Sequence, residues 1–108
     1  MGFKPITLDR TRNLRYGMKA VSMIEERIKK PIMSVDFDNL TMNELAVVVW
    51  AGLAWEDESL TPNKVMDIID ASQDTIKITE VLKTAAGALQ DAFVEEIEVN
   101  EETDEKNV

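Results

Sequence analysis

The run LAVVVWAGLAW at residues 45–55 constrains this chain more than any other feature, because none of its side chains carries a charge. On a helical projection its apolar groups point in every direction rather than along one stripe. A helix of that kind must be enclosed on all sides, by other helices of its own domain or partly by another chain. The run is too short to cross a lipid bilayer. It therefore predicts the central helix of a small soluble bundle.

Two helix start signals flank this run, one just before it and one shortly after it. Thr41 precedes Glu44 by three residues, which is the spacing of a capping box and predicts a helix that runs from there through Glu56. Thr61 and Pro62 repeat the signal, with a cap followed by a proline at the first helical position, where a missing N–H costs nothing. A third helix is expected to follow, with Val65, Met66, Ile68 and Ile69 on its buried side.

Two further amphipathic helices are expected from the spacing of apolar residues. The first covers residues 10–30, ends before Pro31, and has its apolar stripe at Leu14, Gly17, Val21, Ile24 and Ile28. The last covers residues 75–97, and its inward side is Ile78, Val81, Leu82, Ala85, Leu89, Ala92 and Phe93. Before them, residues 3–8 favour a short β segment, because Pro5 suits an edge strand.

The sequence as a whole predicts a mainly α fold: a small bundle of about four helices with a short N-terminal β segment and a disordered acidic C-terminal tail. A chain of 108 residues is expected to form one domain. Residues 1–97 are interpreted as a single helical domain. Residues 98–108, which lack periodicity and are rich in acids, are interpreted as the disordered tail.

Composition argues against catalysis and against a bound metal or cofactor. The chain has no histidine and no cysteine, so the commonest general base and the commonest metal ligands are missing. Asp36 and Asp38 do not open a calcium loop, because Thr41 and Val47 stand where that loop needs glycine and glutamate. We therefore expect a protein that is not an enzyme, with no catalytic, cofactor-binding or metal-binding residues.

Charge is distributed unevenly along the chain. The net charge is −9, made up of +5 in residues 1–30, −8 in residues 31–94 and −6 in residues 95–108. An acidic chain repels phosphate, so nucleic acid is not an expected partner. The basic first third is interpreted as a solvated helix face, or as one that meets the acidic face of a neighbouring subunit. No signal or membrane segment is recognised at the N-terminus, so a cytoplasmic protein is expected.

Two interpretations of the apolar central helix remain open. It is either a core helix or a helix whose second face meets a partner. The residues expected to contact that partner are Leu45, Val48, Val49, Trp50, Leu53 and Trp55. Gly52 is expected to permit the close approach of another helix. Four methionines are expected to fill the core, although flexible methionines also suit a surface that accepts varied apolar partners: Met18, Met23, Met42 and Met66.

Taken in order, several short motifs between residues 6 and 70 resemble the tail assembly chaperones of long-tailed bacteriophages, especially the branch shared with gene transfer agents. The matching stretches are Tyr16, Ile24-Glu25-Glu26, Pro31-Ile32, Trp50-Ala51-Gly52-Leu53, Glu56-Asp57, Leu60-Thr61 and Ile69-Asp70. Two features depart from the pattern. Trp55 stands where members often have a histidine, and members often open with two strands where this sequence indicates one.

The resemblance implies a non-catalytic protein that holds the tape measure protein soluble in the host cytoplasm while tail tube subunits assemble around it. It also implies that the chaperone is absent from the mature virion. A second copy of the chain and the tail tube protein are further candidate partners.

Two hypotheses from other classes stay open beside the chaperone. The first is a small acidic inhibitor or regulator that uses Glu56, Asp57, Glu58 and the tail to bind a basic site on a host protein. The second is a structural tail component, which predicts that the protein is found in purified virions.

Overall fold

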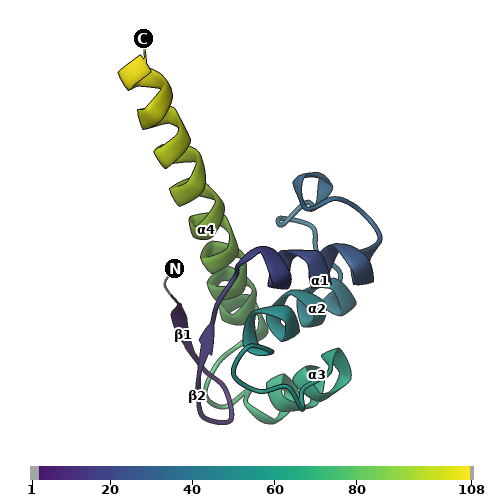
Figure 1. Ribbon diagram of the computed structural model, residues 1–108. Coiled ribbons are helices and arrows are strands. Elements are labelled where there is room, and N and C mark those ends of the chain that lie inside the picture. The colour runs from purple at the N-terminus through teal and green to yellow at the C-terminus, as the bar shows by residue number, and fades with distance from the viewer. Residues whose placement is uncertain (1–2, 108) are drawn as a thin grey trace.

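A computed structural model describes the backbone of residues 3–107 and the side chains of residues 3–92 (Figure 1). It confirms a mainly α bundle of four helices, preceded by a two-stranded hairpin. The elements in chain order are β1 (Lys4–Thr7), β2 (Thr11–Leu14), α1 (Met18–Ile28), the short 3₁₀ helix η1 (Ile32–Ser34), α2 (Met42–Leu53), α3 (Pro62–Ala71) and α4 (Ile78–Asn107).

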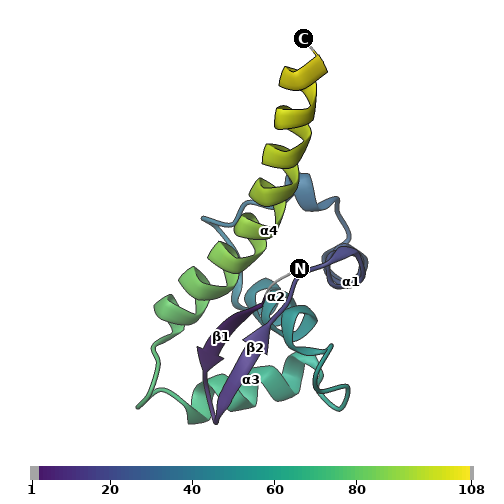
Figure 2. The same ribbon diagram turned by 60° about the vertical axis from the view of Figure 1, so that its left-hand side comes forward.

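Helix α2, which contains most of the apolar run, lies at the centre of the fold. It packs against α1, α3, α4 and β2, and Figures 1 and 2 show it surrounded by these elements. Seven of its twelve residues are buried: Leu45, Ala46, Val48, Val49, Ala51, Gly52 and Leu53. The chain's own elements therefore enclose most of this helix, as its core interpretation requires.

The two predicted helix starts are confirmed. The Thr41 hydroxyl accepts a hydrogen bond from the Glu44 N–H at 3.1 Å, and the Glu44 carboxylate accepts one from the Thr41 N–H at 2.9 Å. Thr61 caps α3 in the same way by accepting from the Lys64 N–H at 3.1 Å. Helix α2 ends at Leu53, earlier than the expected Glu56. The chain turns tightly there, and the Leu53 carbonyl accepts hydrogen bonds from the N–H groups of Glu56 and Asp57, both at 3.2 Å.

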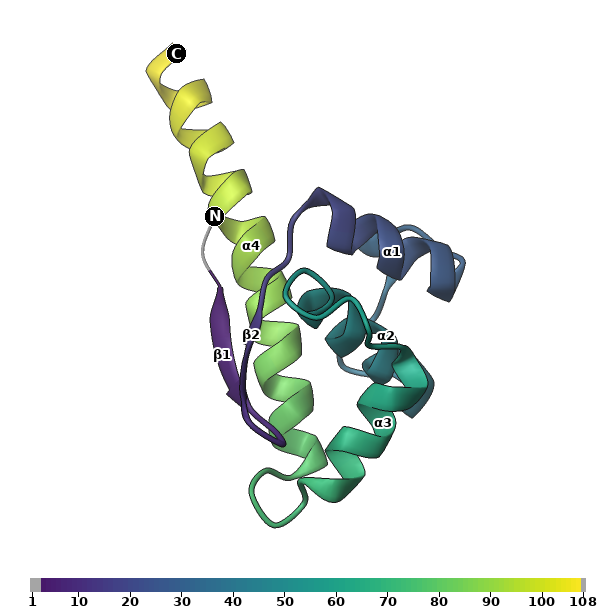
Figure 3. The ribbon, with the colours of Figure 1, turned by 60° about the horizontal axis from the view of Figure 1, so that its bottom comes forward.

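The N-terminal part of the chain corrects the sequence prediction. Residues expected to open the first helix form β2, which pairs antiparallel with β1 and places Lys4 opposite Leu14. Side chains alternate here with a period of two, so Arg12, Leu14 and Tyr16 all point into the protein. A charged residue at one inward position concealed this pattern in the sequence. Figure 3 shows the resulting hairpin beside α4.

Helix α1 is consequently shorter than expected. Leu14 and Gly17, which were assigned to its apolar stripe, precede it, and Ala20 and Ile24 are its buried residues. The helix ends at Ile28, and Lys29 caps it: its positive φ of 70° and its N–H bond to the Glu25 carbonyl close the last turn.

Helix α4 begins at Ile78, later than the predicted residue 75, and buries Val81, Ala85 and Leu89 against the bundle. Its ribbon continues to Asn107 and extends beyond the other elements (Figure 1). Two predictions concern residues outside the part of the chain whose side chains are described. They are the inward position of Phe93 and the disorder of residues 98–108.

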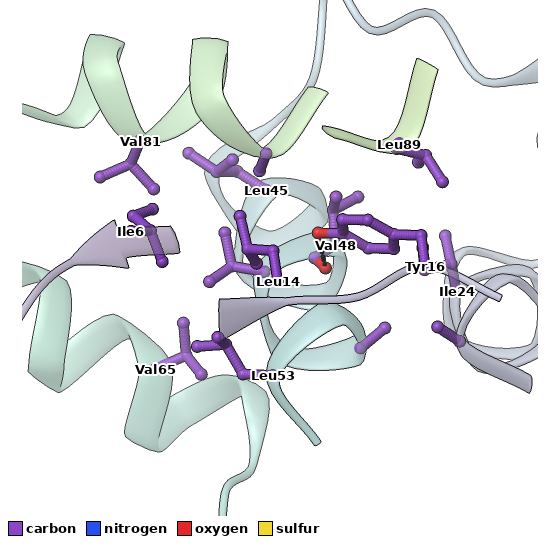
Figure 4. Packing of buried hydrophobic residues seen from close by; sticks show 14 of the residues in the cluster. Ile6, Leu14, Tyr16, Ile24, Leu45, Val48, Leu53, Val65, Val81 and Leu89 are labelled. Atoms are coloured by element: carbon purple, nitrogen blue, oxygen red, sulfur yellow. Dashed lines mark hydrogen bonds between the residues drawn. The ribbon is translucent and has the colours of Figure 1, made fainter. Parts of the chain in front are cut away.

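The segment from β2 to α1 crosses α2 at Gly52. The Tyr16 hydroxyl donates a hydrogen bond to the Val48 carbonyl at 2.7 Å, and the Arg15 N–H donates to the Gly52 carbonyl at 2.9 Å. Figure 4 shows Leu14 and Tyr16 directed at this part of α2. The close approach expected at Gly52 is therefore made by the chain's own β2–α1 segment rather than by another helix.

Candidate partner-binding surface

The structure divides the six residues expected at a partner interface into two groups. Leu45, Val48, Val49 and Leu53 are at most 2% exposed, so they belong to the core and cannot touch a partner in this conformation. The expectation for these four is corrected, because α1, α3, α4 and β2 cover the faces of α2 that carry them. Trp50 and Trp55 remain as surface candidates, and both lie near the C-terminal end of α2.

Trp50 is half-buried and is held by two contacts. Its indole N–H donates to the Leu60 carbonyl at 3.0 Å, so the polar edge of the ring is satisfied inside the chain. The guanidinium of Arg27, which extends from α1, lies 5.0 Å from the ring centroid, within the range of a cation–π contact. These contacts fix the ring beside α1.

Trp55 follows the end of α2 and is 44% exposed. Its indole N–H donates to the Asn13 carbonyl at 2.8 Å, which fixes the ring against β2. The Phe3 ring lies 6.1 Å away, and the guanidinium of Arg15 lies 5.4 Å from the indole centroid. An indole that keeps this orientation offers apolar surface to water with little rotational freedom left to lose on binding.

A groove of about 640 Å³ runs between the N-terminal half of α1 and the C-terminal end of α2. We call it the α1–α2 groove. Its apolar lining includes both tryptophans and two methionines, and it is bordered by charged side chains. The principal residues are Met18, Met23, Trp50, Ala54, Trp55 and Leu60, with Arg15, Lys19 and Glu58 as the charged groups.

Met18 is the lining residue whose position the sequence did not reveal. It was expected in the core, yet it is 90% exposed at the first position of α1. Met18 also lines a second hollow of about 410 Å³ on the other side of the α1 start, which reaches Ala92 on α4. The apolar surface therefore continues over the beginning of α1 from one hollow to the other.

Basic side chains outnumber acidic ones around the α1–α2 groove, although the chain as a whole is acidic: Arg15 and Lys19 stand against Glu58. Arg15, before α1, and Lys19, on α1, line the groove, and Arg27 on α1 lies over the Trp50 ring. Among the side chains of residues 3–92, these three cations form no salt bridge. Their charge is thus available to carboxylates of an incoming partner.

Arg12, which the sequence did not indicate, stabilises the part of the chain that carries Trp55. It is 4% exposed, and its guanidinium donates to both carboxylate oxygens of Asp9, at 2.8 and 2.9 Å, and to Asp57 at 3.2 Å. The hydrogen bonds from Arg12 lower the pKa of Asp9. The pKa of Asp57 is lowered mainly by its hydrogen bond with the Ser59 hydroxyl and, to a smaller extent, by Arg12. The hairpin is thereby tied to the turn after α2, next to Trp55.

The neighbouring acidic run is also engaged within the chain. Glu56 accepts from the Asn13 N–H at 2.9 Å, and Asp57 binds Arg12 and Ser59. Glu58, by contrast, faces the α1–α2 groove. The three consecutive carboxylates therefore do not form one outward cluster.

Among the described residues, no group of three or more acidic side chains is placed to hold a metal ion. None of the helices, over the stretch that the structure describes, combines the length and apolarity needed to cross a membrane.

Comparisons of the chain with protein-family models, with curated proteins and with solved structures gave no match. The function is therefore inferred from the α1–α2 groove and from the sequence.

Proposed function

We propose that this protein is a tail assembly chaperone of a long-tailed bacteriophage, and that it keeps the tape measure protein soluble during tail assembly. The observation that carries the proposal is the α1–α2 groove, in which Trp50, Trp55 and Met18 present apolar surface to water. Exposed apolar grooves on small soluble proteins commonly mark sites for protein partners. The resemblance of the ordered motifs between residues 6 and 70 to tail assembly chaperones supports the tape measure protein as that partner.

The groove has the chemistry needed to hold segments of a long helical guest. Helices bind in grooves by inserting apolar side chains at intervals of three or four residues, and methionines adapt to side chains of different shape. Met18 and Met23 supply such flexible contacts, whereas the hydrogen-bonded Trp50 and Trp55 supply fixed ones. A mixture of fixed and adaptable contacts fits a guest whose sequence varies along its length.

The charge of the whole chain supports the same role. A net charge of −9 keeps a complex with an apolar guest dissolved through mutual repulsion between complexes. In this proposal the protein acts in the host cytoplasm and leaves before the virion is complete. It performs no chemical step.

Co-expression with the tape measure protein of the same phage tests the proposal. Met18→Gln replaces an exposed apolar side chain with a polar one of similar size, so we expect less soluble guest. Met33→Gln is the matched control, because Met33 is also exposed, at 81%, but lies on η1 outside both hollows. A guest that stays insoluble with the unaltered protein, or that is equally soluble with both variants, would contradict the proposal.

The alternative of an acidic regulator makes a different prediction about salt. Binding by charge mimicry weakens as ionic strength rises, since the screening length is only about 8 Å at physiological salt. Apolar binding in the α1–α2 groove persists. The internal contacts of Glu56 and Asp57 count against the regulator, because carboxylates already bound to Asn13 and Arg12 are less available to a basic host site.

A further inference from the structure

The α1–α2 groove and the end of the chain carry opposite charges. Arg15 and Lys19 border the groove, and Arg27 lies beside it. Residues 95–108 contain seven acidic side chains and one basic one. The three cations at the groove form no salt bridge with the side chains that the structure describes, so an apolar groove beside them favours an occupant that is both apolar and acidic.

The sequence of residues 93–98, FVEEIE, has this combination. Phe93 and Ile97 are four positions apart, and Val94 and Ile97 are three apart, so a helix brings the three apolar groups onto one face. On the same projection Glu96 and Glu98 flank this face on its two sides. The pattern complements a groove whose lining is mainly apolar and includes two basic side chains, Arg15 and Lys19, and one acidic one, Glu58.

We propose that residues 93–104 of one copy dock in the α1–α2 groove of a second copy. A second copy is favoured over the same chain because α4 is continuous from Ile78 and its ribbon runs away from the body of its own chain (Figures 1 and 3). The docked segment places Phe93, Val94 and Ile97 against the tryptophan and methionine side chains. The flanking glutamates then meet Arg15 and Lys19.

This contact regulates the proposed chaperone surface. Self-docking covers the exposed apolar lining while no guest is present, and a guest segment with more apolar contacts displaces it. The regulatory role rests on the proposed function. The docking itself does not, and it is tested without any guest.

Sedimentation velocity of the full-length protein over a range of concentrations measures the association. We expect reversible association at low ionic strength that weakens as salt is added. The double variant Arg15→Glu/Lys19→Glu replaces attraction with repulsion at the groove border, so we expect its association to be weaker by about tenfold or more. Glu96→Lys/Glu98→Lys is expected to weaken association by a similar factor.

Mixing the two double variants identifies the contact. The first variant has glutamates at the groove border, and the second has lysines at the two positions that flank the apolar face of the segment. The two are therefore expected to associate with each other although each alone does so poorly. Recovery in the mixture supports docking between chains. A mixture that associates no better than its components overturns the proposal.

Lys77→Glu/Lys83→Glu is the matched control for the groove variant, because it makes the same change in charge at two exposed positions outside the groove, one just before α4 and one within it. An equal loss of association in this control would show a general effect of net charge and overturn the specific contact. Circular dichroism confirms that each variant is folded. If Arg15→Glu/Lys19→Glu loses guest solubilisation but keeps its self-association, the groove binds the guest alone; self-docking then fails while the proposed function stands.

Discussion

Gly52 leaves the space on α2 into which the β2–α1 segment packs. A Cβ atom built at this position would lie 2.6 Å from Tyr16 Cζ and 2.9 Å from Leu14 Cδ2. Neither neighbour can move away cheaply, because both are buried and the Tyr16 hydroxyl is bonded to α2. The glycine is thus required by a close approach inside the chain.

Gly52→Ala is therefore expected to lower the free energy of unfolding by about 2 kcal/mol through overpacking. Gly87→Ala is the matched control, because nothing lies within 4 Å of a Cβ built at Gly87 in the interior of α4. The control is expected to stabilise the protein by about 0.5–1 kcal/mol through higher helix propensity. Urea unfolding measures both changes, and a neutral Gly52→Ala would show that the β2–α1 segment is free to shift.

Tyr16 gives the protein a specific sensitivity to alkali. Burial raises the pKa of Tyr16 above its ordinary value of 10.0, so the folded state favours the neutral phenol. The Tyr16 phenol therefore ionises at a lower pH in the unfolded state than in the folded state. The contribution of Tyr16 to stability is complete below about pH 10 and declines above it, by at most about 1.4 kcal/mol per pH unit.

Urea unfolding from pH 8 upward tests this dependence against Tyr16→Phe, which lacks the ionisable group and is expected to cost about 1 kcal/mol at neutral pH. Because Tyr16 is the single tyrosine in the chain, tyrosinate absorbance reports on it alone. We expect that absorbance to rise with unfolding rather than at the pH of a free phenol. Identical pH profiles for the two proteins would contradict the assignment.

At the scale of elements, Arg12 fastens the hairpin to the turn after α2. It is buried, and its guanidinium binds Asp9 within the hairpin and Asp57 in the turn. We expect Arg12→Met to lower stability at neutral pH by about 1–2 kcal/mol, because charge-assisted hydrogen bonds are lost while the partly exposed Asp9 becomes solvated.

The two carboxylates that bind Arg12 make the free energy of unfolding depend on pH in the acidic range. Because the pKa values of Asp9 and Asp57 are lowered in the folded state, their contribution is present above the unfolded pKa near 3.8 and is lost as pH falls through the lowered values. Arg12→Met removes much of this dependence, so its unfolding curves should change less between pH 5 and pH 2. An unchanged acid profile in urea unfolding would show that Arg12 is not its source.

The sequence predicted those elements that local chemistry specifies. The caps at Thr41 and Thr61 fixed the starts of α2 and α3, because each requires only a side chain and the backbone beside it. Strand β2 was missed because its inward row begins with a charged residue, Arg12, which is buried between Asp9 and Asp57, and Asp57 is distant in the sequence. Pairing over that distance leaves no local pattern.

The candidate surface was only partly predictable for a related reason. Of the six residues expected at a partner interface, Trp50 and Trp55 keep exposed surface, whereas their four companions on α2 are buried in the core. Apolar residues on all sides of a helix do not indicate which side the rest of the chain will leave open. Met18 was expected in the core only because methionines commonly fill cores, and residue type alone does not show that Met18 lies exposed at the start of α1.

At the scale of the whole molecule, the two parts of the chain differ in charge and in exposed apolar surface. The bundle holds the groove with its basic border, while the chain beyond Ala92 is strongly acidic. Both proposed occupants, a guest helix and the terminal segment of a second copy, would bind the same face. Occupancy of that face by either one should therefore exclude the other.

Tryptophan fluorescence reports this occupancy directly, because the chain has two tryptophans and both line the α1–α2 groove. In the dilute protein we expect acrylamide, a neutral quencher that the basic border does not attract, to quench Trp55 more than the half-buried Trp50. Trp55→Phe should accordingly lose the more accessible part of the emission. Addition of guest is expected to reduce quenching of the unaltered protein and to shift its emission to shorter wavelength, since water is excluded from both indoles. Equal quenching with and without bound guest would place the guest elsewhere on the molecule.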